Sequence, residues 1–312
     1  MTATALVIGE AVLDVVHAEG APPDERPGGS AVNVAVALAR LGRPVRLATA
    51  YADDAAGARI AGHLRAAGVD LAGDPHVLAA TPRADAVIDP SGAATYSFEI
   101  GWRLPALPAA PAHVVHVTSL APLLDPGAGD VLALVERIAP TACISYDVNL
   151  RPAITGARRE VVERVLRTAA AATVVKASDE DLLALWPDRS AGESASALLA
   201  LPDGPVAVVV THGGEGASWH ACAGADWSTG GVHAEPVEVV DTIGAGDTFA
   251  AALLDHLWPL LGPGARDRLA ALGPDAWSAA LGYAGRAAAV TVGRVGADPP
   301  TRAELDVLPG RG

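Results

Sequence analysis

Short runs of consecutive apolar residues, many of them β-branched, recur along this chain. A strand with one solvated face alternates apolar and polar side chains, whereas a strand buried on both faces is apolar throughout. The runs therefore predict strands of a parallel sheet that is covered on both faces. They occupy residues 5–8, 45–50, 114–117, 144–148, 173–175 and 206–210.

Segments rich in Ala, Leu and Arg, with the spacing of helices, lie between these runs. Strands that alternate with helices favour a doubly wound α/β fold, with a mostly parallel sheet and helices on both of its faces. The predicted helices span residues 32–41, 55–67, 131–138, 158–170, 248–260 and 276–292.

Three strand-like segments break this alternation. Residues 84–89 and 95–100 are joined through an Asp-Pro-Ser-Gly sequence that is typical of a hairpin turn, and no helix is attached to them. Residues 12–17 continue from the first buried run. We expect these three strands to form a small sheet beside the main one.

Acidic residues outnumber basic residues, and the formal net charge is −14 at pH 7. The sequence has no run of Lys or Arg, so it lacks the basic patch that nucleic-acid binding requires, and we expect no nucleic-acid partner. A small anionic ligand would need local backbone donors or a metal ion to overcome this charge.

The N-terminal residues carry Glu10 and Asp14 but no Lys or Arg before residue 17, which is the opposite of a signal peptide. No apolar run approaches the ~18 residues of a membrane-spanning helix. We therefore expect a cytoplasmic protein with no membrane partner. Cys143 and Cys222 have no metal or redox spacing and are expected to be small buried side chains.

Residues 241–249, Asp-Thr-Ile-Gly-Ala-Gly-Asp-Thr-Phe, carry the sharpest chemical signal. They follow a predicted strand at residues 237–240 and open a long apolar helix. The small residues Gly244, Ala245 and Gly246 let backbone N–H groups converge at a helix N-terminus, which favours a bound anion. Asp247 would then lie within reach of a hydroxyl that attacks a phosphoryl group, and could accept its proton. A helix-stabilising acid in the first turn is the alternative.

This string resembles the D-T-x-G-A-G-D motif of the ribokinase-like (pfkB) carbohydrate kinases. Residues 28–35, Gly-Gly-Ser-Ala-Val-Asn-Val-Ala, are similar to that family's N-terminal motif, and the likeness extends from about residue 4 to residue 305. The resemblance implies one kinase domain over residues 1–312, with a β lid formed by about 12–17 and 84–103.

The same resemblance implies roles for the phosphate end of the site. Asp247 would be the catalytic base, and Gly244, Ala245 and Gly246 would form the anion hole for the transferred group. ATP would be the phosphoryl donor. The family's nucleotide-phosphate motif, T-x-G-x-x-G, is matched at the end of another buried run by Thr211, Gly213 and Gly216, which alone are typical of a glycine turn.

For the sugar, the resemblance implies contacts from Asp14, Gly28, Gly29 and Asn33, since each sugar hydroxyl stripped of water needs a new partner. Taken alone, the two glycines are equally typical of a turn before a helix, with Ser30 as its N-cap.

Residues 145–152, Ser-Tyr-Asp-Val-Asn-Leu-Arg-Pro, close a buried run at the strand end where open α/β sheets bind ligands. They resemble the D-x-N-x-R motif of fructokinases and 2-keto-3-deoxygluconate kinases, which implies substrate contacts from Asp147 and Arg151. A surface ion pair is the alternative for Arg151. Tyr96 and Arg103, on and after the hairpin, are expected to cover the sugar, with lid packing as the alternative for Tyr96.

Residues 176–181, Lys-Ala-Ser-Asp-Glu-Asp, resemble the segment that holds the family's N-x-x-E magnesium motif. The resemblance implies that Lys176 contacts the nucleotide and that Glu180 and Asp181 contact Mg²⁺ through water. Ser178 stands where the motif has Asn, and Asp181 stands where it has Glu. Helix capping is therefore the alternative for this segment. K⁺ is a further candidate cofactor.

The resemblance as a whole implies an ATP-dependent sugar kinase, closest to fructokinases, that forms a homodimer through the lid. A 2-keto-3-deoxygluconate kinase or another ribokinase-like sugar kinase stays open, because Arg103 and Arg151 are both placed to bind an acid sugar. A non-catalytic sugar sensor on the same fold is the alternative from outside the enzymes.

Overall fold

The computed structural model describes residues 3–18, 20–88, 94–108, 110–156, 158–223 and 226–307. Within these residues, nine strands form a central sheet in the order β13-β12-β11-β10-β9-β8-β1-β4-β5. The strands from β5 to β11 pair in parallel, whereas β12 and β13 add an antiparallel edge. The strands are β1 (Ala5–Ile8), β4 (Val45–Ala48), β5 (Asp70–Leu71), β8 (Val114–Thr118), β9 (Cys143–Asp147), β10 (Val174–Ser178), β11 (Ala207–Thr211), β12 (Ala217–Ala223) and β13 (Asp226–Val232).

The first strand shows why its apolar run is continuous. Ala5 and Val7 belong to one apolar core, and Leu6 and Ile8 belong to a second core on the opposite face of the sheet. Both faces of the strand are therefore buried, as its sequence predicts.

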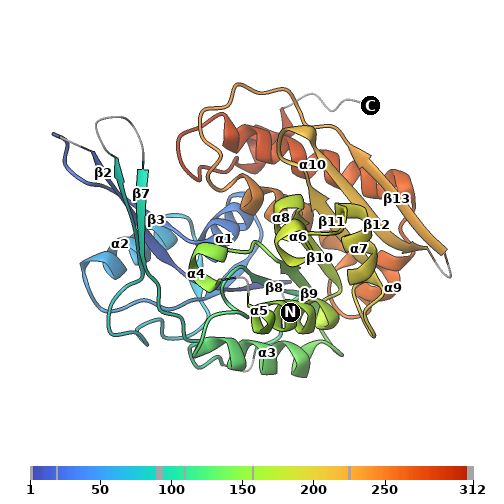
Figure 1. Ribbon diagram of the computed structural model, residues 1–312, viewed down its shortest axis with the longest axis horizontal. Helices are drawn as coiled ribbons and strands as arrows, with labels where there is room; N and C mark the ends of the chain where they lie inside the picture. Colours follow the sequence, from blue (N-terminus) through green and yellow to red (C-terminus); the bar gives the residue numbers. More distant parts are fainter. Residues whose placement is uncertain are drawn as a thin grey trace.

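Helices pack on both faces of the central sheet (Figure 1). The doubly wound, mostly parallel α/β fold predicted from the sequence is confirmed. None of the helices that the structure describes is both long and apolar enough to cross a bilayer. One face carries α1 (Ser30–Arg40), α2 (Ala55–Ala66), α8 (Ala245–His256), α9 (Ala265–Ala270) and α10 (Pro274–Val292); the other carries α3 (Gly127–Ile138), α5 (Arg159–Ala171), α6 (Asp179–Leu185) and α7 (Ala191–Leu199). Short helical segments are α4 (Pro152–Thr155), η1 (Gly213–Glu215), η2 (Trp258–Leu260) and α11 (Arg302–Asp306).

Four of the described strands form a small sheet in the order β3-β2-β6-β7, which stands apart from the central sheet in Figure 1. The prediction that three strands outside the main sheet pair with one another is confirmed. The predicted hairpin turn lies outside the described residues. The strands are β2 (Val12–Ala18), β3 (Asp24–Gly28), β6 (Arg83–Ile88) and β7 (Ala94–Glu99).

The fourth strand, β3, was not predicted. Its sequence, Asp-Glu-Arg-Pro-Gly, has no apolar alternation, and it is an edge strand that pairs with β2 alone. An edge strand tolerates charged residues and a proline, because one side of its backbone needs no ladder partner.

The strand predicted at residues 237–240 is not a strand. Val237, Val239 and Val240 are exposed, and the Val240 N–H donates to the Val292 carbonyl near the end of α10 (2.9 Å). β13 already forms the edge of the central sheet and ends at Val232. The segment therefore leads from that edge to α8 without a described strand beside it.

Candidate active site

A cavity of about 340 Å³ lies at the carboxyl edge of the parallel strands. The residues that follow β1, β8 and β9 form one wall, the N-termini of α1 and α8 form another, and β2, β6 and β7 of the small sheet close the remaining side. Ligands of open α/β sheets bind at this edge. The polar lining residues are Glu10, Asp14, Ser30, Asn33, Ser119, Asn149, Arg151, Thr242 and Asp247.

Asp247 lies in the first turn of α8 and is 8% exposed. Its Oδ1 accepts a hydrogen bond from Ser30 Oγ (2.6 Å), and its Oδ2 accepts one from Asn33 Nδ2 (2.8 Å). Both donors come from the first turn of α1. Each carboxylate oxygen can accept a second bond, so the fixed carboxylate keeps acceptor capacity at the cavity.

Ser30 is not the N-cap that its place in the sequence predicts. Gly29 is the N-cap of α1 and makes no side-chain cap. The hydroxyl of Ser30 has one proton, and it donates this proton in the hydrogen bond to Asp247. In its other two bonds, Ser30 Oγ therefore accepts from Thr118 Oγ1 (2.7 Å) and from Asn149 Nδ2 (2.9 Å). Ser30 therefore connects the ends of β8 and β9 to Asp247.

The loop before α8 is held by Asp241. Its carboxylate accepts from the Ile243 N–H (3.0 Å) and from the Gly296 N–H (2.8 Å), which ties this loop to the one after α10. Gly244 has φ +74°, and a Cβ on it would lie 2.5 Å from Ala297 Cβ. The first backbone N–H groups of a helix have no intrahelical acceptor, so this turn has donors for a phosphoryl group, although the Ala245 N–H also donates to the Thr242 carbonyl (3.3 Å).

Gly28 and Gly29, before α1, let the backbone lie close to Asp14 and to the Glu10 carbonyl. A Cβ on Gly28 would lie 2.2 Å from Asp14 Oδ2, and a Cβ on Gly29, where φ is +98°, would lie 2.5 Å from the Glu10 carbonyl oxygen. Burial raises the pKa of Asp14 to about 6. Asp14, Gly29 and Asn33 line the cavity together, as expected from the sequence, whereas Gly28 lies behind Asp14.

Asp147 and Lys176 form a buried ion pair, with 3.0 Å between Oδ2 and Nζ. Neither side chain lines the cavity. The sequence predicted a sugar contact for Asp147, but its carboxylate is turned toward the neighbouring strand, where Lys176 is its register partner.

Asp181 does not fit the predicted metal site. Its two carboxylate oxygens accept from the backbone N–H groups of Ser178 (2.8 Å) and Leu150 (2.7 Å), and Ser178 Oγ accepts from the Asp181 N–H. This is a capping box, the alternative that the sequence left open. Glu180 beside it is exposed, and its carboxylate has no hydrogen bond or ion pair among the described residues. In the part of the chain that the structure describes, no group of three or more His, Cys, Asp and Glu residues is placed to hold a metal ion.

Residues 3–304 match the family described as pfkB family carbohydrate kinase. The chain belongs to this family. It is 33% identical over 273 residues to a fructokinase from Rhizobium leguminosarum bv. trifolii, a match that covers 81% of this chain and 79% of the relative. The resemblance seen in the sequence is therefore confirmed, and the protein is a carbohydrate kinase of this family.

Several solved structures with the same fold carry ligands, and two of them are the following. A double mutant of fructokinase from Vibrio cholerae O395, in its fructose, ADP and potassium ion bound form, is 25% identical with a TM-score of 0.77, covering 98% of this chain and 97% of that one. Aminoimidazole riboside kinase from Salmonella enterica, complexed with aminoimidazole riboside and an ATP analogue, is 25% identical with a TM-score of 0.78, covering 97% and 98%.

Tyr96 and Arg103, which were predicted to cover the sugar, do not line the cavity themselves. Phe98 lines it, and Tyr96, which is 63% exposed, stacks on Phe98 with 6.3 Å between ring centroids but lies farther out. Trp102 is fully buried and donates to the Ala121 carbonyl (2.9 Å). Arg103, the next residue, is exposed and does not line the cavity. Among the described residues, Arg151 is the one arginine in the cavity lining.

The predicted nucleotide residues lie at the same edge of the central sheet, beyond the cavity. Thr211 ends β11 beside Ser178 of β10. Gly213 and Gly216 have positive φ, and a Cβ on Gly216 would lie 2.1 Å from the Val232 carbonyl oxygen. Contact with ATP phosphates stays a prediction for these residues.

Sequence reasoning missed several cavity residues that share one signal. Glu10, Ser119 and Asn149 are polar residues that follow β1, β8 and β9 within two positions. Ser119 and Asn149 have positive φ (53° and 37°), a strained backbone that occurs most often at functional sites. Burial raises the pKa of Glu10 to about 7, against the opposing effect of its hydrogen bonds and of Arg151.

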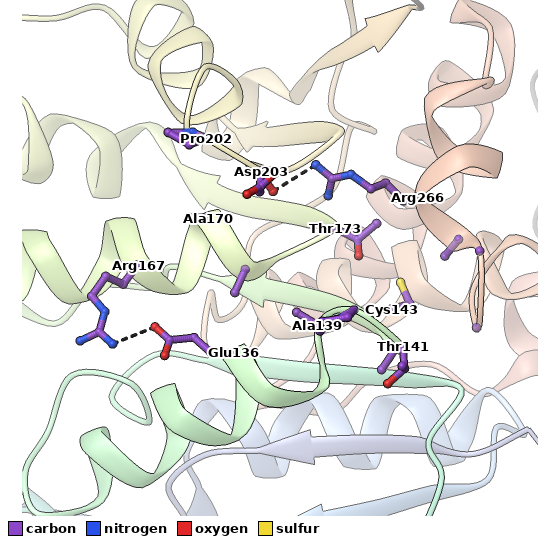
Figure 2. A pocket seen from close by; sticks show the side chains of 16 residues that line it. Glu136, Ala139, Thr141, Cys143, Arg167, Ala170, Thr173, Pro202, Asp203 and Arg266 are labelled. Atoms are coloured by element: carbon purple, nitrogen blue, oxygen red, sulfur yellow. Dashed lines mark hydrogen bonds and ion pairs between the residues drawn. The ribbon is translucent and has the colours of Figure 1, made fainter.

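A larger hollow of about 590 Å³ lies at the opposite edge of the sheet, where β9 and β10 begin (Figure 2). Small residues such as Cys143 and Thr173 form its floor. Its arginines already have partners: Arg167 pairs with Glu136 (2.8 Å), and Arg266 donates to the Asp203 carbonyl (3.1 Å). No motif residue of the kinase lines this hollow.

Proposed function

We propose that this kinase is a fructokinase, which transfers the γ-phosphoryl group of ATP to a hydroxyl of fructose, a neutral ketohexose. The observation that carries the proposal is the charge of the cavity. Among the described residues, Arg151 is the one arginine of its lining, and it faces Asp14 and Asp247. Glu10 adds a partial negative charge, since its pKa is raised to about 7. A neutral polyol suits these acceptors, whereas an acid sugar would be repelled. The fructokinase relatives support the same substrate.

In the proposed reaction, Asp247 accepts the proton of the attacking sugar hydroxyl. The new bond joins that oxygen to the γ-phosphorus, the bond to the bridging oxygen breaks, and ADP leaves. Ser30 and Asn33 hold the Asp247 carboxylate, and the first N–H groups of α8 bind the transferred group.

Mg²⁺ and K⁺ belong to the proposal as cofactors. Glu180, whose side chain is exposed, would hold Mg²⁺ through water, and the ATP phosphates would complete the shell of the ion, as substrate phosphates usually do. When bound, Mg²⁺ would neutralise phosphate charge. The potassium-bound fructokinase supports K⁺.

The small sheet is proposed to act as a lid over the sugar and as the contact of a homodimer. Val12 and Phe98 of this sheet and Ile100, directly after β7, line the cavity, while Val16 and Tyr96 lie exposed farther along the sheet. Closure would exclude water that could hydrolyse ATP. One domain over residues 1–312 and a cytoplasmic location, where ATP is supplied, complete the proposal.

A substrate panel tests the function. ADP release would be measured with fructose, 2-keto-3-deoxygluconate and aminoimidazole riboside, the last because of the structural relative. We expect turnover to depend on added sugar and kcat/KM to be highest for fructose. A higher value for the acid sugar would overturn the assignment. Sugar binding without turnover would favour a sugar sensor.

The Asp247→Asn variant tests the base. General-base catalysis contributes about 10²–10⁴-fold, so kcat should fall by that factor. An amide can accept on one side only, so one of the two donors at residue 247 loses its acceptor, and a lower Tm is expected. Retention of more than about a tenth of wild-type kcat would fall short of a general-base effect and exclude the role.

A further inference from the structure

Lys176 is the only lysine in the sequence, and it is buried beneath the proposed anion hole. Its side chain is 7% exposed, and that of Asp147 is fully buried. Removing two charges from water is costly, and an ion pair recovers this cost only with good geometry and further hydrogen bonds. Asp147 Oδ1 has no hydrogen-bond partner among the described residues. The pair is therefore a poor choice for stability alone.

The position of the pair connects it to the phosphate end of the site. A Cβ placed on Gly246 would lie 3.2 Å from Lys176 Nζ, so the ammonium lies directly against the backbone of that turn. Asp147 is the register partner of both Thr118 and Lys176 in the central sheet. Thr118 contacts Ser30, the residue that donates to Asp247.

Lys176 stays charged in these surroundings. Burial alone would lower its pKa, but the carboxylates of Asp147, Asp181 and Asp247 more than offset this effect and raise the pKa. A positive charge at a buried position acts strongly on a nearby anion, because little water lies between them to screen it.

We propose that the Lys176 ammonium supplies positive charge behind the N–H groups of Gly244, Ala245 and Gly246 and stabilises the transferring phosphoryl group, while Asp147 positions that ammonium. This role replaces the sugar contact that the sequence suggested for Asp147. It rests on phosphoryl transfer at the start of α8, and it does not depend on which sugar accepts the group.

Two variants separate this role from a structural one. Lys176→Met leaves Asp147 buried and unpaired, so it should lower both Tm and kcat. The double variant Asp147→Asn/Lys176→Met removes both charges, and replacing a buried pair in this way is often neutral for stability. We expect the double variant to regain the wild-type Tm while its kcat stays about 10²-fold low, the effect of losing one stabilising donor. The KM for sugar should be little changed.

Recovery of kcat together with Tm in the double variant would show that the pair is structural and would overturn the proposal. If Lys176→Met does not fold, the double variant decides alone. Arg167→Met, which breaks the exposed pair with Glu136 at the opposite edge, is the control and should keep full kcat. All assays use a sugar that the wild type turns over, so a failure of the fructose assignment would appear first in the wild type.

Discussion

At the scale of single residues, the site depends on the hydroxyl of Ser30, for which the sequence suggested only a helix cap. Ser30 Oγ accepts hydrogen bonds from Thr118 and Asn149 and donates one to Asp247, so the ends of β8 and β9 and the start of α8 meet at this one atom. A carboxylate held by two donors cannot rotate away from the cavity. A general base must be held in the reactive geometry relative to the attacking hydroxyl of the substrate, and these two bonds hold it there.

We therefore predict that Ser30→Ala lowers kcat by about 10- to 10²-fold with little change in KM, because a hydrogen bond to a charged group stabilises by about 1.5–3 kcal/mol. The measurement is steady-state kinetics together with the melting temperature.

Thr291→Val is the matched control for Ser30→Ala. It removes another buried hydroxyl bond to α8, from Thr291 Oγ1 to Thr248 Oγ1 (2.9 Å), outside the Asp247 network. It should lower Tm without lowering kcat. Equal loss of kcat in both variants would mean that Ser30 acts only through the stability of α8.

At the scale of elements, the start of α8 is fixed by close contact with the loop after α10. Gly244 has a left-handed backbone, and it faces Ala297 at a distance that leaves no room for a side chain. The turn that presents the N–H groups is thus set by two segments that are far apart in the sequence.

Gly244→Ala should lower both Tm and kcat, since a left-handed conformation costs about 1–2 kcal/mol for a residue with a Cβ and Ala297 must move. Gly273→Ala, at the N-cap of α10, is the control: its φ is −79° and nothing lies within 4 Å of the added Cβ. A Gly244→Ala variant as active and stable as the control would contradict this account of the turn.

The elements that could be predicted from the sequence are those whose signal is local. Continuous apolar runs marked β1, β4, β8, β9, β10 and β11 of the central sheet, because burial on both faces leaves a pattern in each strand by itself. β5 was not predicted, since it has two residues and both are exposed. β3 has no such pattern, since only its pairing with β2 makes it a strand. Residues 237–240 have the pattern of a strand but no described neighbour.

The same limit applies to the site. Residues 241–249 placed Asp247 and its glycines, because the helix start is a local structure. The role of Ser30 arises from Thr118, Asn149 and Asp247, which lie 88, 119 and 217 residues away along the chain. For Asp181, the sequence pattern allowed either a metal ligand or a helix cap. The structure shows the cap, and the Asp181 carboxylate also accepts from the backbone N–H of Leu150, which lies 31 residues away.

At the scale of the whole molecule, the distal end of α8 is anchored as firmly as its start. Asp255 is buried and accepts from Arg43, Arg302 and Tyr283, which come from the α1–β4 connection, α11 and α10. These bonds join the C-terminal helices to the body of the kinase. Around the start of α8, by contrast, lie charged groups whose burial reduces stability.

Glu10 is one of those groups, and its effect on stability depends on pH. Its pKa is raised by burial from 4.5 to about 7. Below pH 4.5 the carboxyl is protonated in both the folded and the unfolded chain, so it makes no difference. Between pH 4.5 and 7 the unfolded chain releases the proton while the folded chain keeps it, and the folded state loses stability as the pH rises.

Glu10→Gln removes this loss because the amide does not ionise. We predict that the variant gains free energy of unfolding over the wild type as the pH rises from 4.5 to 7, and that the gain is constant above pH 7. One pKa unit corresponds to about 1.4 kcal/mol, so the gain is at most on the order of 3 kcal/mol. Denaturant unfolding at several pH values measures this gain.

Glu304→Gln is the matched control, and its change in the free energy of unfolding should have the opposite sign. The pKa of Glu304 is lowered to about 2 by its bonds to Thr301 and Arg294, so this variant should be less stable than the wild type above pH 4.5 and equal to it below pH 2. If Glu10→Gln shows no gain between pH 5 and 8, the burial of Glu10 does not reduce the stability of the kinase.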